Sequence, residues 1–198
     1  MTDTSDLVRE KLLEGLSVTE AVARDTTLHA KLQEAAEATA AALESGHKLM
    51  VAGNGGSAAG AQHLAAEFVC RLVDDRPAMR AVALTTDSSI LTAVGNDYGY
   101  DRVFARQIEA LGQTGDVFLV ISTSGNSPNV LRALELSRKM AIVTIGLTGR
   151  TGGKMAPLCD YCLHIPSDVT MHIQQAHLAL EHIFCMIVER MYFRTSAG

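Results

Sequence analysis

The 198-residue sequence predicts an α/β fold of three layers, αβα, in which helices cover both faces of a five-stranded parallel sheet. Three observations support this prediction. Short apolar runs alternate with helical patterns from residue 47 onward. A glycine-rich turn and a Ser/Thr-rich turn each follow one such run and precede a helix. The composition, 47% hydrophobic and 20% charged, fits one globular domain, 1–198, with a substantial core.

Helices are expected before this sheet, because residues 1–46 carry a helical pattern and the α/β core occupies 47–198. Leucines and alanines recur at helical spacing, and Asp25-Thr26-Thr27 divides the pattern into two helices. Gly46 is placed to end the second helix, since glycine readily adopts the left-handed conformation found there. These helices could pack on the core or form an interface with another subunit.

Strands and helices then alternate along the core. The expected strands are 48–52, 81–85, 117–121, 142–147 and 161–165. The expected helices follow Ser57 and cover 88–94, 102–111, 128–139 and 170–192. Pro128 with Ser127 before it is a typical helix start. Ligands of parallel sheets bind beyond the carboxyl ends of the strands, so both polar turns are expected on the binding edge.

The glycine-rich turn, residues 53–57, reads GNGGS. Its glycines permit backbone angles and close approaches that a Cβ would block. Ser57 is expected as the N-cap of the next helix, whose N–H groups and dipole suit a phosphate. An ordinary tight strand–helix connection is the alternative. His63 and Glu67, four residues apart, should project from one face of this helix as an acid/base or metal pair.

The second turn, residues 122–127, reads STSGNS and carries more hydroxyl and amide groups than a turn requires. Neither turn contains lysine or arginine, so the P-loop pattern is absent. A phosphate bound here would be held by hydroxyls and backbone N–H groups. A solvated Ser/Thr loop is the alternative interpretation.

Charge and apolar patterning exclude several classes of partner. A net charge of −5 without any basic run argues against nucleic-acid binding. The N-terminus is charged and lacks the apolar segment of a secretion signal, and no apolar run is long enough for a bilayer. A cytoplasmic location without membrane contact is therefore expected. Cys159 and Cys162 form a CxxC that could be a redox pair or half of a zinc site, although reduced structural thiols are favoured.

The expected final helix, 170–192, is apolar on more than one side, so burial by a partner subunit as well as by its own sheet is predicted. The same helix carries Gln174, His177, Glu181 and His182. A histidine among apolar neighbours is either a core or interface residue with satisfied hydrogen bonds or a ligand. The first interpretation is the more usual one, but several polar groups in one apolar helix weaken it.

Four motifs occur in order along the chain: GNGGS followed by HxxxE, the Asn-Asp of GNDYGYD, ISTSGNSPNV, and IQQAHLALEH. Together they resemble the sugar isomerase (SIS) domain family, and within it the phosphoheptose isomerases, over essentially the whole chain. The resemblance implies a flavodoxin-like SIS fold and a homotetramer with sites at subunit interfaces. It further implies aldose–ketose isomerisation of D-sedoheptulose 7-phosphate to D-glycero-D-manno-heptose 7-phosphate through an enediol. This reaction is the first step of ADP-heptose or GDP-heptose biosynthesis, which supplies lipopolysaccharide, a surface-layer glycan or another heptoside.

The same resemblance implies roles for individual residues. The catalytic carboxylate and histidine would be Glu67 and His182. The substrate-binding residues would be Asn54, Gly55, Gly56, Ser57, Glu67, Asn96, Asp97, Ser122, Thr123, Ser124, Ser127 and Gln174. The ligands of one zinc ion per subunit would be His63, Glu67, Gln174 and His182. Where the family usually has IQE, this chain has IQQ. The difference is at Gln175, which stands beside one expected zinc ligand.

Other functions within the family remain as alternatives. Some relatives bind the DNA replication initiator and do not isomerise sugars. We expect those to lack the histidine at the position of His182, which this chain retains together with His63 and Glu67. Regulatory SIS modules are usually fused to a DNA-binding domain, whereas residues 1–45 are acidic and contain no basic recognition helix. An arabinose 5-phosphate isomerase is a further alternative, but the expected zinc ligands favour the heptose.

Overall fold

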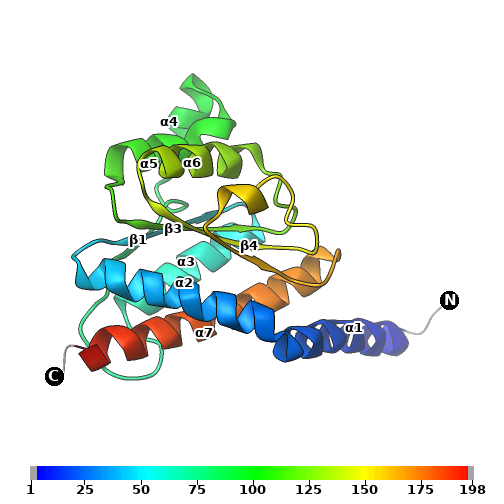
Figure 1. Cartoon of the computed structure of the whole chain (residues 1–198). Coiled ribbons are helices and arrows are strands. Elements are labelled where there is room, and N and C mark those ends of the chain that lie inside the picture. Colours follow the sequence, from blue (N-terminus) through cyan, green and yellow to red (C-terminus); the bar gives the residue numbers. More distant parts are fainter. Residues whose placement is uncertain (1–3, 196–198) are drawn as a thin grey trace.

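A computed structural model describes residues 4–195, and it has the three predicted layers (Figure 1). The strands are β1 (Leu49–Gly53), β2 (Ala81–Ala83), β3 (Val117–Ser122), β4 (Val143–Thr148) and β5 (Tyr161–His164). They form one sheet in the order β2-β1-β3-β4-β5, and every neighbouring pair is parallel. This is the strand order of flavodoxin-like folds, so the predicted five-stranded parallel α/β fold is confirmed.

The direction of winding reverses between β1 and β3, which are neighbours in the sheet. The chain leaves β1 for the edge strand β2 and returns to β3, which pairs with β1 from Leu49↔Val117 to Gly53↔Ile121. A crevice at such a reversal is the usual ligand site of an open α/β sheet. The two polar turns, 53–57 and 122–127, follow β1 and β3 and therefore flank this point.

Helices α1 (Thr4–Arg24) and α2 (Thr26–Glu44) precede the sheet, as predicted. The helix break falls at Asp25, whose side chain accepts a hydrogen bond from the Leu28 backbone N–H at 2.9 Å and so caps α2. The remaining helices are α3 (Gly56–Val69), α4 (Ser88–Asp97), α5 (Val103–Leu111), α6 (Pro128–Lys139) and α7 (Thr170–Thr195). Two single 3₁₀ turns are η1 (Tyr100–Arg102) and η2 (Ala156–Leu158).

The two faces of the sheet are covered by different helices. Figure 1 shows α2, α3 and α7 on one face and α5 and α6 on the other, with α4 beyond them. Alternate residues of β1 point to opposite faces, because a strand has a period of two. Leu49 and Val51 join the core under α2, α3 and α7, whereas Met50 and Ala52 join the core under α5 and α6. Both faces are thus buried, as expected for a parallel sheet.

The first turn of α3 differs from the expected one. The N-cap is Gly55, with φ of +56°, and not Ser57, which lies inside the first turn and is buried. Glycine takes this backbone angle without the penalty that a Cβ would bring. The N–H groups of Ser57 and Ala58 donate to the carbonyls of Asn54 and Gly55 at 3.0 Å. The prediction of a serine cap was therefore wrong.

Helix α1 extends away from the body (Figure 1), and several of its apolar side chains are exposed. Its exposed apolar residues, 47% to 65% accessible, are Leu7, Val8, Leu12, Leu13 and Leu16. An exposed group of this kind usually marks a contact with another molecule. Within residues 4–195, no helix is long and apolar enough to cross a membrane.

Candidate active site

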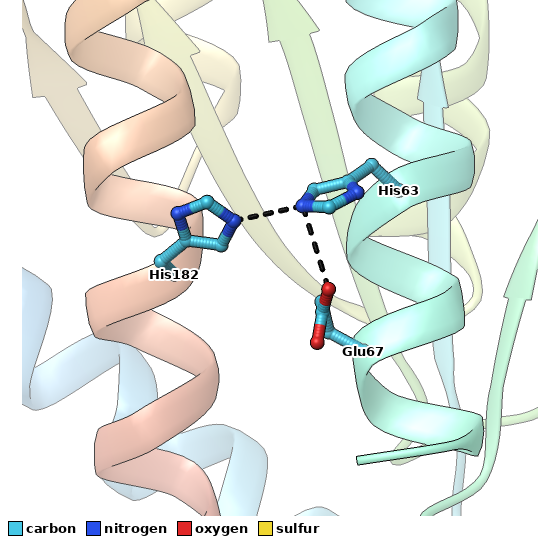
Figure 2. A group of neighbouring side chains, drawn as sticks. All are labelled: His63, Glu67 and His182. Carbon is cyan, nitrogen blue, oxygen red and sulfur yellow. Dashed lines mark hydrogen bonds and ion pairs between the residues drawn. The ribbon is translucent and has the colours of Figure 1, made fainter. Parts of the chain in front are cut away.

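Three predicted site residues meet between α3 and α7. His63 and Glu67 project from α3 toward His182 of α7 (Figure 2). The Nε2 atoms of His63 and His182 are 2.7 Å apart, and His63 Nε2 is 3.5 Å from Glu67 Oε1. One of the two histidines must donate the proton of the short ring contact. The predicted HxxxE pair on one helix face is present, and α7 supplies its partner from 119 positions along the chain.

This His63–Glu67–His182 group could hold a metal ion. The three ligand atoms all lie within 4.8 Å of one another, and the three side chains are half-buried. Two ring nitrogens and a carboxylate oxygen are donors that zinc accepts. The residues therefore fit the expected kind of metal.

A cavity of about 410 Å³ opens beside this group, between α3 and α7. Its lining consists of Gly56, Ser57, Ala59, Gly60, His63, Ile121, Gln174, His177, Leu178, Glu181 and His182. Gln174 packs tightly against the glycine turn, because a Cβ on Gly56 would lie 2.6 Å from Gln174 Nε2. The structure thus brings five residues of the predicted site into one cavity wall, which are Gly56, Ser57, His63, Gln174 and His182.

Two further polar residues of this cavity were not assigned a role from the sequence. His177 and Glu181 are only 1% and 2% exposed. Burial lowers the pKa of His177 to about 4, against a smaller opposite effect of its hydrogen bond to the Thr148 backbone. Burial also raises the pKa of the Glu181 carboxyl to about 7. Their spacing in the final helix is visible in the sequence, but their burial beside a cavity depends on the fold.

The glycine turn is tied to the start of α6 by a pair of amides. Asn54 Nδ2 donates to Asn129 Oδ1 at 3.0 Å, and Asn129 Nδ2 donates to Asn54 Oδ1 at 2.8 Å. Tyr100 Oη lies 3.4 Å from the same Asn54 oxygen. This reciprocal pair crosses the point where the winding of the sheet reverses. Nothing in the sequence alone assigns Asn129 a role, because it is a single polar residue at the start of a helix.

The Ser/Thr-rich turn is organised by its own hydroxyls and by a neighbouring loop. Ser122 Oγ and Ser127 Oγ are 3.3 Å apart, and Ser124 Oγ accepts from the Asn126 N–H at 3.2 Å. Gly125, with φ of +63°, packs against the 152–153 backbone so closely that a Cβ would clash. Ser127 is the N-cap residue of α6, but its side chain does not cap the helix. Its hydroxyl instead pairs with that of Ser122 on the binding edge.

Asn96 and Asp97 lie apart from the cavity. Both are exposed at the end of α4, and Asn96 Nδ2 donates to Asp97 Oδ1 at 2.7 Å. Within the described chain they do not line the cavity beside His63.

Gln175, the departure from the family's IQE, also points away from the cavity. It lies against Gly15 of α1, where a Cβ would be 2.7 Å from Gln175 Oε1. Its neighbour His172 has Nε2 3.1 Å from Glu14 Oε2 and Nδ1 3.4 Å from Gln175 Oε1. The changed residue thus belongs to the contact between α1 and α7, and the polar lining of the cavity is unaffected by it.

Arg76 fixes the helix end next to Glu67. Its guanidinium donates to the backbone carbonyls of Glu67 at 2.7 Å and Phe68 at 2.9 Å, and to Glu189 Oε2 of α7 at 2.6 Å. Carbonyls at the end of a helix lack intrahelical partners, so the guanidinium satisfies them. The side chains of Arg76 and Glu189 are both buried, and this pair links the end of α3 to α7 next to Glu67 of the His63–Glu67–His182 group. The sequence offered no pattern that linked these two residues.

Comparison with known proteins places these observations in a family. The SIS domain model matches residues 16–149. A phosphoheptose isomerase of Aneurinibacillus thermoaerophilus is 48% identical over 190 residues, which cover 96% of each chain. One from Bradyrhizobium sp. strain ORS 278 is 53% identical over 190 residues, again 96% of each chain. The solved phosphoheptose isomerase of Francisella tularensis superposes with a TM-score of 0.91 at 36% identity, over 96% of this chain and 100% of that one.

The similarity extends over nearly the full length of both this chain and its relatives. The chain belongs to the SIS domain family and, within it, to the phosphoheptose isomerases, which are phosphosugar isomerases.

Proposed function

We propose that this enzyme, as one SIS domain spanning 1–198, interconverts D-sedoheptulose 7-phosphate and D-glycero-D-manno-heptose 7-phosphate. The observation that carries the proposal is the His63–Glu67–His182 group beside a cavity at the reversal point of the sheet. The substrate class follows from the relatives named phosphoheptose isomerase. The product is the starting sugar of ADP-heptose or GDP-heptose biosynthesis, and we place the reaction in the cytoplasm.

The reaction moves a carbonyl between C2 and C1 and requires the removal of a proton from the carbon beside the carbonyl. We assign this step to the Glu67 carboxylate, which lies on α3 with Oε1 3.5 Å from Nε2 of His63, a residue that lines the cavity. The product of the step is a cis-enediol. His182, on the opposite helix, returns a proton to the neighbouring carbon or exchanges protons with the sugar oxygens.

The phosphate and the sugar chain use different turns in this proposal. Ser122, Thr123, Ser124 and Ser127 bind the phosphate with hydroxyls and backbone N–H groups. The turn from Asn54 to Ser57 binds the sugar, and its asparagine is held in place by Asn129. Asn96 and Asp97 would reach the sugar only from α4, so they contribute at the outer rim or to another subunit's site.

A zinc ion would be held by His63, Glu67, Gln174 and His182. Zinc acts as a Lewis acid that polarises the substrate carbonyl and stabilises negative charge on its oxygen. Because a carboxylate has two oxygens, Glu67 would keep an acceptor for the carbon-bound proton when zinc is held by this group.

The enzyme would assemble as a homotetramer with its sites at subunit interfaces. The exposed leucines of α1 and the exposed Leu178 and Ile183 of α7 supply apolar surface beside the cavity and at the N-terminal helix. Burial of such surface drives association between subunits. Light scattering during size-exclusion chromatography measures the mass of the assembly directly. A monomer mass at micromolar concentration would contradict the homotetramer.

The decisive experiment is an assay of the purified protein with sedoheptulose 7-phosphate. The enzyme is first treated with chelator, and turnover is then measured with and without added zinc. Formation of the aldose heptose 7-phosphate, restored by zinc, supports both the substrate and the metal. No turnover under either condition would refute the proposed reaction, whereas full turnover by metal-free protein would refute only the role of zinc.

A further inference from the structure

Two residues that line the cavity each have a buried polar atom without a hydrogen-bond partner. Within residues 4–195, the buried side-chain atoms left without one are Thr148 Oγ1, His177 Nδ1 and Glu181 Oε2. The last two belong to residues that line the same cavity as His63 and His182. Buried polar groups nearly always have a partner, so a group without one requires an explanation.

The protonation of His177 follows from its single hydrogen bond. His177 Nε2 lies 3.2 Å from the Thr148 backbone oxygen, and a carbonyl oxygen can only accept. Nε2 therefore carries the proton, which leaves Nδ1 as an acceptor. His177 Nδ1 is thus a buried acceptor whose donor is missing from the described protein.

The Glu181 carboxyl occupies space that a glycine provides. It reaches from α7 to α3, where a Cβ on Gly60 would lie 3.2 Å from each of its two oxygens. His177 and Glu181 are four residues apart on α7 and so lie on one helix face, one turn from each other. Whether ionised or protonated, a carboxyl can accept a hydrogen bond from a hydroxyl group.

We propose that His177 and Glu181 bind hydroxyl groups on the carbon chain of the phosphosugar and thereby select its length. A sugar hydroxyl fits because it donates one hydrogen bond and accepts others, so it can serve a ring nitrogen and a carboxyl in either form. This inference rests on the proposed isomerase function and adds specificity-determining residues to it. Neither residue acts on the reacting carbons.

Replacement of Glu181 with leucine separates a binding role from a structural one. If Glu181 stabilised the fold, its replacement would lower the stability of the protein. If its carboxyl is buried without a partner, replacement by an apolar residue of similar size should raise the stability of the protein. We therefore expect Glu181→Leu to melt at the wild-type temperature or higher. We expect its kcat/KM for sedoheptulose 7-phosphate to fall by roughly 10- to 100-fold.

Chain-length selectivity provides the second measurement. The ratio of kcat/KM values for seven-carbon and five-carbon ketose phosphates should decrease toward one in Glu181→Leu, because the shorter sugar has fewer hydroxyls to lose. Glu181→Gln, which keeps an acceptor oxygen, should retain most of the wild-type ratio. Glu135→Leu, on the exposed side of α6, is the matched control and should match wild type in both rate and ratio.

The outcomes separate the two proposals. Failure of the wild-type protein to isomerise any heptose phosphate would refute the proposed function and this inference with it. An active wild type, with a folded Glu181→Leu variant of unchanged kcat/KM and unchanged length ratio, would overturn the inference alone. A Glu181→Leu variant of lower melting temperature would also overturn it, because the carboxyl would then be stabilising the fold.

Discussion

Buried polar groups in the two helix layers differ in their hydrogen bonding. On the α5–α6 side, Gln107 donates to the carbonyls of Leu84 and Val103 at 2.9 Å, and Ser137 donates to the Ala133 carbonyl at 2.8 Å. On the α3–α7 side, His177 and Glu181 each keep an atom without a partner. The third such atom among residues 4–195 is Thr148 Oγ1, at the carboxyl end of β4. The unpartnered atoms of α7 belong to residues that line the cavity, and we propose that a ligand completes them.

The largest effect should come from the proposed base of the α3–α7 layer. Glu67→Gln preserves size and hydrogen bonding but cannot accept the proton from carbon. We expect kcat for sedoheptulose 7-phosphate to decrease by about 10²- to 10⁴-fold, with an unchanged melting temperature. Steady-state kinetics and thermal denaturation measure the two quantities. A wild-type kcat in folded Glu67→Gln would refute the assignment.

Loss of the Arg76–Glu189 pair should break the contact between α3 and α7. Arg76→Met leaves Glu189 as a buried charge without its partner, which typically costs about 3–5 kcal/mol of unfolding free energy. Urea denaturation measures this cost. The double variant Arg76→Met with Glu189→Leu removes both charges, so it should recover much of the loss. Equal stability of the single variant and wild type would contradict the role of the pair.

His177 should make the unfolding free energy depend on pH. Its pKa is lowered from 6.5 to about 4 in the fold, so between these values the unfolded chain binds a proton that the folded chain does not. Its contribution is complete above pH 6.5 and is lost as the pH falls toward 4, by roughly 3 kcal/mol at most. His177→Gln, which keeps a donor for Thr148, should flatten this slope. Parallel slopes in urea titrations of the two proteins would contradict the buried neutral imidazole.

The smallest functional effect is expected in the opposite layer. Gln107→Leu leaves two backbone carbonyls without their donor, at a cost of about 1–3 kcal/mol in unfolding free energy. Because this layer does not line the cavity, kcat/KM should remain at the wild-type value. A large loss of activity without a loss of stability would erase the contrast between the layers.

The sequence predicted the fold well because its signals are local. Alternating apolar runs fixed the five strands, and Pro128 marked the start of α6 at the correct residue. The turn before α3 was less accurate, since Gly55 with a positive φ, and not a serine side chain, begins that helix. A glycine cap depends on a backbone angle that the residue types alone do not specify.

The site was predictable only in part, for a physical reason. His63 and Glu67 share a helix face by spacing, but their meeting with His182 depends on the packing of α3 against α7 and was supplied by the family resemblance. The amide bridge of Asn129 and the contacts of Arg76 join segments 75 and 113 residues apart. Long-range hydrogen bonds of this kind leave no periodic pattern in the sequence.

Proton exchange with solvent tests the central claim most directly, namely that Glu67 removes a carbon-bound proton to form an enediol. Proton NMR follows sedoheptulose 7-phosphate in D₂O with wild-type enzyme and with Glu67→Gln. The predicted result is an aldose product that carries deuterium at C2 with the wild type, and neither product nor label with the variant. A product whose C2 hydrogen comes entirely from C1 of the ketose, formed equally fast by both proteins, would contradict the claim.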